Sequence, residues 1–288
     1  MSEEKNKVKD GVLYLVGTPI GNLADISERA IKVLSEVSFV AAEDTRNSAK
    51  LLTVLGIRKE LVSYHEHNKR QSGERIKERL LGGESCALVT DAGMPAVSDP
   101  GEDLVALCHE SGIPVSVIPG PCAAISALAM SGLKTARFAF EGFLPTQKSE
   151  KRERLEKVKN DDRTLIFYEA PHKLKATLKD MCEAFGSDRK ISLCREITKI
   201  NEETFKTTLS EAVAFYESAE PRGEYVLIIE GGSGERASAE DSELLLTTPE
   251  EHVAHYEEQG MARMDAIKRA AKDRGITKSE LYKILNKD

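Results

Sequence analysis

The chain has 288 residues, which exceeds one ordinary domain and fits two, with room for a small third. Hydrophobic residues make up 40% of it, enough for packed cores, so global disorder is excluded. The net charge of −7 argues against binding nucleic acid over the whole surface, although it leaves room for local basic patches. Five cysteines without Cys-x-x-Cys spacing indicate reduced thiols rather than disulfides or a zinc site. The N-terminus has no apolar signal segment and no apolar run approaches about 18 residues, so we expect a cytoplasmic protein.

Strand-like and helical patterns alternate in the first half of the chain, which is typical of a mostly parallel sheet with helices on its faces. Apolar runs predict strands over residues 12–16, 39–42, 86–90 and 115–118. Helical spacing predicts helices over residues 25–37, 47–55, 102–111 and 123–130. We expect Asp25 to cap the first of these helices, Gly112 to end the third, and Pro121 to open the fourth.

The alternation restarts after Pro145 and ends in a helical segment. Strands are expected over residues 164–168, 191–195, 203–209 and 225–229, and helices near 171–185 and 210–218. A polar Gly/Ser-rich linker follows, and residues 261–285 resemble a helix-turn-helix. The expected organisation is a disordered tail (1–10), an N-terminal α/β cofactor-binding domain (11–135), a second α/β domain completing a cleft (136–232), a linker (233–247) and a helical RNA-contacting domain (248–288).

Each of the first four strands ends in a segment rich in glycine, proline or charged residues, at residues 17–22, 43–46, 91–101 and 119–124. If the strands are parallel, all four segments lie at the sheet edge where open α/β sheets bind ligands. Glycine lets the backbone approach a ligand closely, and proline limits the order that must be gained on binding. The residues therefore predict a small-molecule cleft along this edge.

The absence of several known motifs excludes some classes of ligand. Gly17 and Gly21 do not form the G-x-G-x-x-G fingerprint of dinucleotide sites, and the Walker pattern for phosphates is absent. His65 and His67 would share one face of an extended segment, but no third ligand is evident nearby, so no metal is expected. There is no G-x-S-x-G nucleophile motif either. The residues by themselves lead only to a glycine-lined cofactor cleft that does not bind nucleotide phosphates.

Five segments resemble the tetrapyrrole methylase superfamily, at residues 15–22, 43–46, 90–101, 119–124 and 167–172. Within it they are most similar to the RsmI family, which methylates the ribose 2′-oxygen of a cytidine (cytidine 1402 in the standard numbering) in the decoding region of 16S ribosomal RNA. The similarity runs through nearly the whole chain. It implies two α/β domains with S-adenosylmethionine folded in the cleft between them. It also implies a homodimer that acts on 16S rRNA in the small ribosomal subunit, without a membrane or DNA partner.

The resemblance also implies roles for single residues. The cofactor would be bound by Pro19, Val89, Thr90, Asp91, Met94, Cys122, Ala123, Tyr168 and Glu169. The candidates for catalysis are Glu43, Asp44, Arg46 and Lys199. The candidates for substrate contacts are Arg46, His65, Arg195, Glu196, Lys268, Arg269 and Lys272, together with the basic stretch 148–163. We expect the carboxylate–arginine group at 43–46 to position the RNA, and the general base stays open.

Two other functions are compatible with the sequence. One is a methyltransferase for a tetrapyrrole or another small molecule. It is disfavoured by the basic segment 261–287, with eight Lys/Arg against three acids, and by Asp91-Ala-Gly-Met94 where tetrapyrrole methylases commonly have Asp-Pro and an aromatic residue. The other is a non-catalytic RNA-binding assembly factor. The glycines of the strand-end loops argue against it, because a site that had lost its ligand would have no need to retain them.

Overall fold

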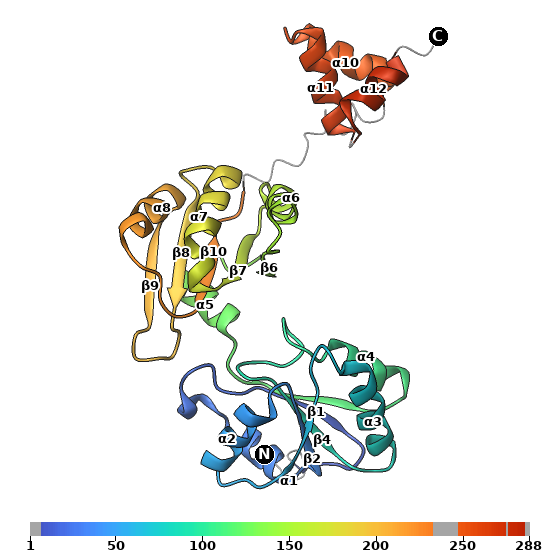
Figure 1. Ribbon diagram of the computed structural model, residues 1–288, viewed down its shortest axis with the longest axis vertical. Helices are drawn as coiled ribbons and strands as arrows, with labels where there is room; N and C mark the ends of the chain where they lie inside the picture. The colour runs from blue at the N-terminus through green and yellow to red at the C-terminus, as the bar shows by residue number, and fades with distance from the viewer. Residues whose placement is uncertain (1–6, 233–246, 275, 286–288) are drawn as a thin grey trace. The chain divides into compact units, whose positions relative to one another are not determined.

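The computed structural model describes residues 7–232, 247–274 and 276–285, except the side chain of Lys272 (Figure 1). The chain divides into two compact units, one comprising Met1–Lys159 and Arg163–Gly231, the other Asn160–Asp162 and Gly232–Asp288. The expected tail and linker fall mostly outside the described residues. Within the described ranges, no helix combines the length and apolar character needed to cross a membrane.

The first sheet lies in the larger unit and has five parallel strands in the order β3-β2-β4-β1-β5. The strands are β1 (Leu13–Val16), β2 (Phe39–Ala42), β3 (Glu60–Ser63), β4 (Cys86–Val89) and β5 (Val115–Ile118). The parallel arrangement and four of these strands were predicted. Strand β3 was not predicted, because it is an edge strand without a fully buried residue and so carries no continuous apolar run.

Helices cover both faces of this sheet. They are η2 (Leu23–Asp25), α1 (Glu28–Glu36), α2 (Thr45–Val54), α3 (Lys69–Leu81) and α4 (Glu102–Glu110). Side chains alternate between the faces, so that Val40 packs in the core that contains residues of α1 and α2, whereas Phe39 packs in the core that contains residues of α3 and α4. Burial on both faces explains the uninterrupted apolar runs of the central strands.

Two of the expected helix boundaries are wrong. Asp25 lies in the short η2, and α1 is capped instead by Ser27, whose hydroxyl accepts the Ala30 N–H at 3.1 Å. Pro121 precedes the cap residue Cys122 rather than opening helix α5 (Ala123–Ser131). The prediction for Gly112 is confirmed, since it follows α4 with a φ of +69°.

The second sheet has the order β6-β7-β10-β8-β9. Its strands are β6 (Phe138–Phe143), β7 (Thr164–Glu169), β8 (Lys190–Arg195), β9 (Glu203–Thr208) and β10 (Tyr225–Ile229). Only β6 and β7 are parallel, and the other neighbouring pairs are antiparallel. The expectation of a mostly parallel arrangement therefore holds for the first sheet alone. No helix lies between β8 and β9, so these strands pair directly as antiparallel neighbours.

Helices α6 (Lys148–Val158), α7 (Pro171–Phe185) and α8 (Leu209–Ser218) pack on one face of the second sheet. Helix α5 follows β5 of the first sheet but packs on the opposite face of the second, beside β8 and β10 (Figure 1). Its Ala127 and Leu128 share a core with Ile166 and Ile228. The segment before α5 therefore brings the β5 loop toward the second sheet.

The smaller unit contains three helices in its described part, α10 (Pro249–Glu258), α11 (Arg263–Asp273) and α12 (Lys278–Leu285). They share a separate core that includes Tyr256, Ile267 and Leu281. Helices α11 and α12 lie where the two helices of the predicted helix-turn-helix were expected, and Gly275 of the predicted turn lies outside the described residues. The fold class is therefore confirmed, with two α/β sheets and a C-terminal helical segment.

Candidate active site

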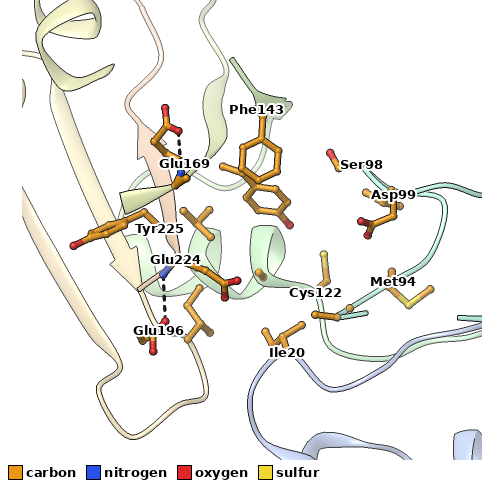
Figure 2. A pocket seen from close by; sticks show the side chains of 18 of the residues that line it. Ile20, Met94, Ser98, Asp99, Cys122, Phe143, Glu169, Glu196, Glu224 and Tyr225 are labelled. Atoms are coloured by element: carbon orange, nitrogen blue, oxygen red, sulfur yellow. Dashed lines mark hydrogen bonds between the residues drawn. The ribbon is translucent and has the colours of Figure 1, made fainter. Parts of the chain in front are cut away.

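A cavity of about 470 Å³ is lined by loops of both sheets of the larger unit (Figure 2). Its volume lies within the range of roughly 300–1,000 Å³ that small-molecule sites occupy. The loops that follow β1, β4 and β5 contribute Ile20, Met94, Ser98, Asp99, Cys122 and Ala123. The second sheet and its loops contribute Phe143, Tyr168, Glu169, Glu196, Ile197, Lys199, Glu224 and Tyr225. The predicted cleft at the strand ends is thus present.

Direct backbone contacts hold three loops of the first sheet together. Thr18 and Gly93 exchange backbone hydrogen bonds of 2.9 and 3.1 Å, and the Thr18 hydroxyl donates to the Thr90 carbonyl at 3.1 Å. Gly17 and Gly120 lie back to back, since a Cβ built on Gly120 would lie 2.8 Å from the Gly17 Cα. Glycine at these two positions is therefore a steric requirement for bringing the β1 and β5 loops together.

The two loops that face the cavity from opposite sides carry backbone strain. Ala96 and Ser98 in the β4 loop have φ of 66° and 62°, and Glu196 and Thr198 after β8 have φ of 50° and 68°. In the described part of the chain these are the only non-glycine residues with positive φ. Such conformations persist where the surroundings enforce them, often at ligand sites.

Acidic side chains gather where the β2 and β4 loops meet. The Thr90 hydroxyl donates to Glu43 Oε2 at 3.1 Å, and the Asn47 amide donates to Asp91 Oδ2 at 2.9 Å. Burial, reinforced by the charges of Glu43 and Asp91, raises the pKa of Asp99 to about 6. Of these acids only Asp99 lines the cavity.

The Asp44–Arg46 pair lies outside the cavity lining. Asp44 caps α2 by accepting the Arg46 N–H at 2.8 Å and forms an ion pair with the Arg46 guanidinium at 2.8 Å. Hydrogen bonds from Arg46 lower the pKa of Asp44 to about 2. The Arg46 side chain is 85% exposed, so its place is on the surface near the β4 loop rather than at the cavity wall.

Other candidates stand behind or beside the cavity lining. Pro19, Thr90 and Asp91 belong to the lining loops and Val89 ends β4, but none of these four residues lines the cavity itself. His65 lies after the edge strand β3. Arg195 pairs with Glu203 at 2.6 Å rather than facing the cavity. His65 and His67 have ring centroids 6.0 Å apart, and the described residues contain no group of three His, Cys, Asp or Glu arranged to hold a metal ion.

The wall of the cavity that β6 and β7 form is aromatic. The Tyr168 ring lies edge-on to Phe140 and Phe143, with centroid distances of 5.1 and 5.4 Å, and Phe143 stays 60% exposed. Burial raises the pKa of Tyr168 to about 12, so its hydroxyl stays protonated. The neighbouring Glu169 carboxylate accepts the Ala170 N–H at 2.8 Å and the Thr177 hydroxyl at 2.6 Å.

Lys199 forms a charged bridge at the other end of this wall. Its ammonium lies 2.9 Å from both Glu196 and Glu224. Burial alone would lower the pKa of Lys199, but the hydrogen bonds to Glu224 and Glu196 outweigh it and raise the pKa. A Cβ on Gly21 would lie 2.5 Å from the Lys199 Cγ, so glycine lets the lysine stem pass. Lys199 is therefore a fixed cation and not a neutral base.

The two basic segments, residues 148–163 and 261–287, differ in the contacts that their side chains make. Several cations of α6 pair with acids, as Arg154 does with Glu141 at 2.6 Å and Lys157 with Glu153 at 2.7 Å. On α11, Lys268 and Arg269 are exposed, and Arg269 lies 3.6 Å from Asp273. The Lys272 side chain lies outside the described residues.

Several cavity residues were missed by the sequence reasoning, among them Asp99, Phe143, Glu224 and Tyr225. Asp99 is one of two acids in the long loop, but nothing in the spacing distinguishes it from Asp91. Glu224 and Tyr225 stand at the beginning of β10. They reach the site because β10 runs antiparallel to β7 and β8, and its start lies beside their ends. A search of strand ends alone passes over such residues.

Solved structures that resemble this chain in fold include two that are named as methyltransferases. Uroporphyrin-III C-methyltransferase from Thermus thermophilus superposes with a TM-score of 0.53 at 21% identity, over 76% of this chain and 94% of that one. The cobalamin biosynthetic enzyme cobalt precorrin-4 methyltransferase gives a TM-score of 0.56 at 15% identity, over 80% and 97%. The sequence model of the tetrapyrrole (corrin/porphyrin) methylases matches residues 12–213, and the chain belongs to this family.

Relatives in sequence show which branch of the tetrapyrrole methylase family this chain is most similar to. A protein of Halalkalibacterium halodurans named ribosomal RNA small subunit methyltransferase I is 49% identical over 96% of each chain. The Bacillus subtilis protein of that name is 47% identical over 94% of this chain and 93% of its own. The one from Thermotoga maritima is 44% identical over 77% of this chain and 99% of its own. The resemblance first seen in five motifs is confirmed.

Proposed function

We propose that the protein transfers a methyl group from S-adenosylmethionine to the ribose 2′-oxygen of a cytidine in the decoding region of 16S ribosomal RNA. The observation that carries this proposal is the cavity built from the strand-end loops of a methylase-family chain whose relatives are named for the small-subunit RNA. The alternative acceptor is a tetrapyrrole, on the strength of the shared fold.

The cavity residues fit this cofactor. Behind the lining, the back-to-back contact of Gly17 and Gly120 leaves room for Met94, whose sulfur would lie 2.8 Å from a Cβ built on Gly17. Met94, Cys122 and Ala123 on one wall and Tyr168 on the other would hold the cofactor. When bound, it supplies an activated methyl group for in-line displacement, which depends mainly on how the reactants are aligned.

Of the other cofactor residues proposed from the motifs, Glu169 lines the cavity, whereas Pro19, Val89, Thr90 and Asp91 lie outside its lining. The Thr90 carbonyl and the Gly93 backbone anchor the β1 loop through Thr18. The Glu169 carboxylate fixes the start of α7 through the Ala170 N–H. Pro19 and Asp91 belong to the β1 and β4 loops and Val89 ends β4, so we assign these three residues to shaping the cofactor site.

Cations at the edge of the site are proposed to receive the RNA. Lys199 is charged and stands at the cavity, and Arg46 projects from the first sheet beside the β4 loop. Arg195 ends β8, Glu196 lines the cavity and His65 follows β3, and we assign all three to the approach of the RNA. Lys268, Arg269 and Lys272 of α11 would add phosphate contacts, for which salt-sensitive affinity is the expected signature. Recognition of folded RNA would rest on its shape and backbone.

Transfer of labelled methyl groups tests the acceptor. Small subunits lacking the modification should be labelled by the purified protein, whereas free 16S rRNA should be labelled more slowly and a porphyrinoid not at all. Labelling of the porphyrinoid in preference would favour the tetrapyrrole reaction. Binding of small subunits without labelling of any acceptor would favour a non-catalytic assembly factor.

The proposed function also implies an oligomeric state and a place in the cell. We propose a cytoplasmic homodimer that acts on the small ribosomal subunit, without a membrane or DNA partner. Light scattering of the purified protein should give twice the chain mass of 31.7 kDa. A monomeric mass at working concentration would contradict the homodimer.

A further inference from the structure

A ribose is bonded to its base at C1′, next to the carbon that carries the 2′-oxygen. A nucleotide that brings its 2′-oxygen into the cavity therefore brings its base to the cavity mouth. Proteins hold unpaired RNA bases by stacking them on aromatic side chains. Three of the described residues that line the cavity are aromatic, namely Phe143, Tyr168 and Tyr225. These rings are the groups to compare.

The three rings differ in how much of their surface is free. Tyr225 is 3% exposed, and its hydroxyl lies 3.4 Å from that of Tyr216. Tyr168 is partly buried and in edge contact with both Phe140 and Phe143. Phe143 stays 60% exposed, and the one ring that contacts it among the described residues, Tyr168, meets it at 61° rather than lying flat on it. Phe143 is thus the ring with an open face at the cavity (Figure 2).

A β-bulge in β6 gives Phe143 its direction. The pairing with β7 shifts between Phe140 and Gly142, so that Glu141 is an extra residue in the strand. In a regular strand, Phe140 and Phe143 would point to opposite faces of the sheet, because they are three residues apart. The extra residue places both rings on one face, where both contact Tyr168. Without the bulge, Phe143 would face away from the cavity.

Two contacts hold this bulge in place. The Arg154 guanidinium of α6 lies 2.6 Å from the carboxylate of Glu141, whose side chain is only 7% exposed. Gly142 has a φ of +65°, and a Cβ built on it would lie 3.2 Å from the Ser98 hydroxyl oxygen in the β4 loop. Bulges beside active sites commonly redirect a side chain. The direction of the exposed Phe143 ring is therefore built into the fold.

Two cations follow Phe143 closely in the chain. Lys148 begins α6 and Arg152 lies four residues further on, so both occupy one face of the helix. Both are exposed, and neither forms an ion pair with another residue in the part of the chain that the structure describes. They differ in this from Arg154 and Lys157, which are paired with acids. An open aromatic ring followed by unpaired cations suits a nucleotide with its flanking phosphates.

We infer that the base of the nucleotide to be methylated stacks on the Phe143 ring, and that Lys148 and Arg152 bind the phosphates next to it. This inference rests on the proposed function and names the part of the cavity mouth that receives the acceptor. Stacking holds the base at the mouth while the ribose enters, and so aligns the 2′-oxygen with the methyl donor. Every base has a flat π-face, so Phe143 contributes affinity and orientation rather than the choice of cytidine.

Binding of small subunits that lack the modification, measured with S-adenosylhomocysteine present so that no methyl group is transferred, tests this assignment. Phe143→Ala should weaken the affinity by roughly 10- to 100-fold, because one base–aromatic stack contributes about that factor. The slope of log affinity against log salt should keep its wild-type value, since no charge is lost. Arg152→Ala should instead lower that slope by about one. Cofactor affinity measured by calorimetry should stay within a few-fold of wild type for both variants, which also shows that they are folded.

Substitutions that keep or remove the aromatic face separate stacking from packing. Phe143→Tyr should bind small subunits as the wild type does, whereas Phe143→Leu, which keeps an apolar side chain, should lose affinity as Phe143→Ala does. Phe215→Ala is the matched control. Phe215 is an aromatic residue of similar exposure, at 49%, on α8 outside the cavity lining, so its replacement should leave binding unchanged.

A tryptophan at this position reports on stacking directly, because the chain contains no tryptophan of its own. The fluorescence of Phe143→Trp should be quenched when free 16S rRNA is added, since an RNA without protein brings no other tryptophan and the indole stacks on a base. The fluorescence of Phe215→Trp should not change.

Wild-type affinity of Phe143→Ala or Phe143→Leu would overturn the assignment to Phe143, and so would unquenched fluorescence of Phe143→Trp with RNA bound. An unchanged salt slope in Arg152→Ala would overturn the phosphate contact. A parallel loss of cofactor affinity in Phe143→Ala would overturn the assignment in favour of a cofactor contact. None of these outcomes touches the proposed function, which fails only if the wild-type protein methylates no small subunits.

Discussion

The partly buried carboxylate of Asp99 should lower the stability of the folded protein. Its folded pKa of about 6 lies above the ordinary value of 3.8, so between these values the folded state binds more protons than the unfolded state. The free energy of unfolding must therefore fall as pH rises through this window. Two pKa units correspond to roughly 3 kcal/mol, which solvent screening at a partly exposed site reduces to about 1 kcal/mol.

Asp99→Asn should consequently stabilise the protein by about 1 kcal/mol at pH 8 and leave it unchanged near pH 4, where the wild-type carboxyl is largely protonated. Urea denaturation at both pH values measures this difference. Equal effects of the substitution at the two pH values would show that Asp99 does not titrate as described.

A second prediction concerns Arg46, whose guanidinium is exposed beside the β4 loop. Arg46→Ala should weaken binding to the small subunit and lower the slope of log affinity against log salt by about one, since one phosphate contact is lost. Cofactor affinity should not change, because Arg46 does not line the cavity. Arg46→Lys keeps the charge and should retain most of the affinity. Near-normal binding and single-turnover methylation by Arg46→Ala would remove it from the RNA-contacting residues.

The sequence predicts cavity residues well where a motif places the side chain itself in the site. Met94, Cys122, Tyr168 and Lys199 all line the cavity. The sequence predicts cavity residues less well where the motif contains only a chain neighbour of the residue that lines the cavity. Asp44 lies in a recognisable motif, but its carboxylate is used to cap α2 and to hold Arg46. The direction of a loop side chain depends on backbone angles such as the positive φ of Ser98, which sequence spacing does not reveal.

At the scale of elements, the contact between the β1 and β5 loops is the tightest constraint on the site. Gly120→Ala would place a methyl group 2.8 Å from the Gly17 Cα, and neither backbone can move without disturbing a parallel strand. We expect a loss of about 1–3 kcal/mol in the free energy of unfolding, as for other overpacked sites, and a clear loss of cofactor affinity.

Gly73→Ala in α3 is the matched control for this prediction. The added Cβ would meet Leu107 at an ordinary distance of 3.6 Å, and alanine favours a helix over glycine. Thermal denaturation and cofactor calorimetry should therefore show a neutral or stabilised variant with normal affinity. If Gly120→Ala behaved in the same way, the two loops would not need their close contact.

Whether a strand can be predicted from the sequence depends on how its residues are buried. Central strands such as β4, buried on both faces, give continuous apolar runs that sequence reasoning detects. Strand β6 contains a register shift between Phe140 and Gly142, where Gly142 has a φ of +65°, and its alternation is broken. The antiparallel insertion of β10 between β7 and β8 is a non-local pairing that no local pattern encodes.

At the scale of the whole molecule, the helical unit is expected to act in RNA binding only. Its core is separate from the cores of the larger unit, and none of the residues that line the cavity belongs to it. The Thermotoga maritima relative is matched over 99% of its own length but only 77% of this chain, so such a relative lacks a counterpart of part of this chain.

Truncation at residue 245 should therefore leave cofactor affinity intact, weaken binding to the small subunit and lower its salt dependence. The double variant Lys268→Ala/Arg269→Ala in the full chain is the matched control, since it removes two exposed cations and keeps the core of the unit. Calorimetry and salt titrations of subunit binding measure both effects. An unchanged salt slope after truncation would contradict an RNA-contacting role for the unit.

The central claim is that the cavity serves methylation of one ribose in small-subunit RNA. It is tested most directly by locating the methyl group in the RNA after reaction of the purified protein with small subunits that lack the modification. Nuclease digestion and mass spectrometry should place a single methyl on the ribose of one cytidine in the decoding region, and the adjacent phosphodiester bond should resist alkali. A methyl group on a base, or on several unrelated nucleotides, would contradict the account.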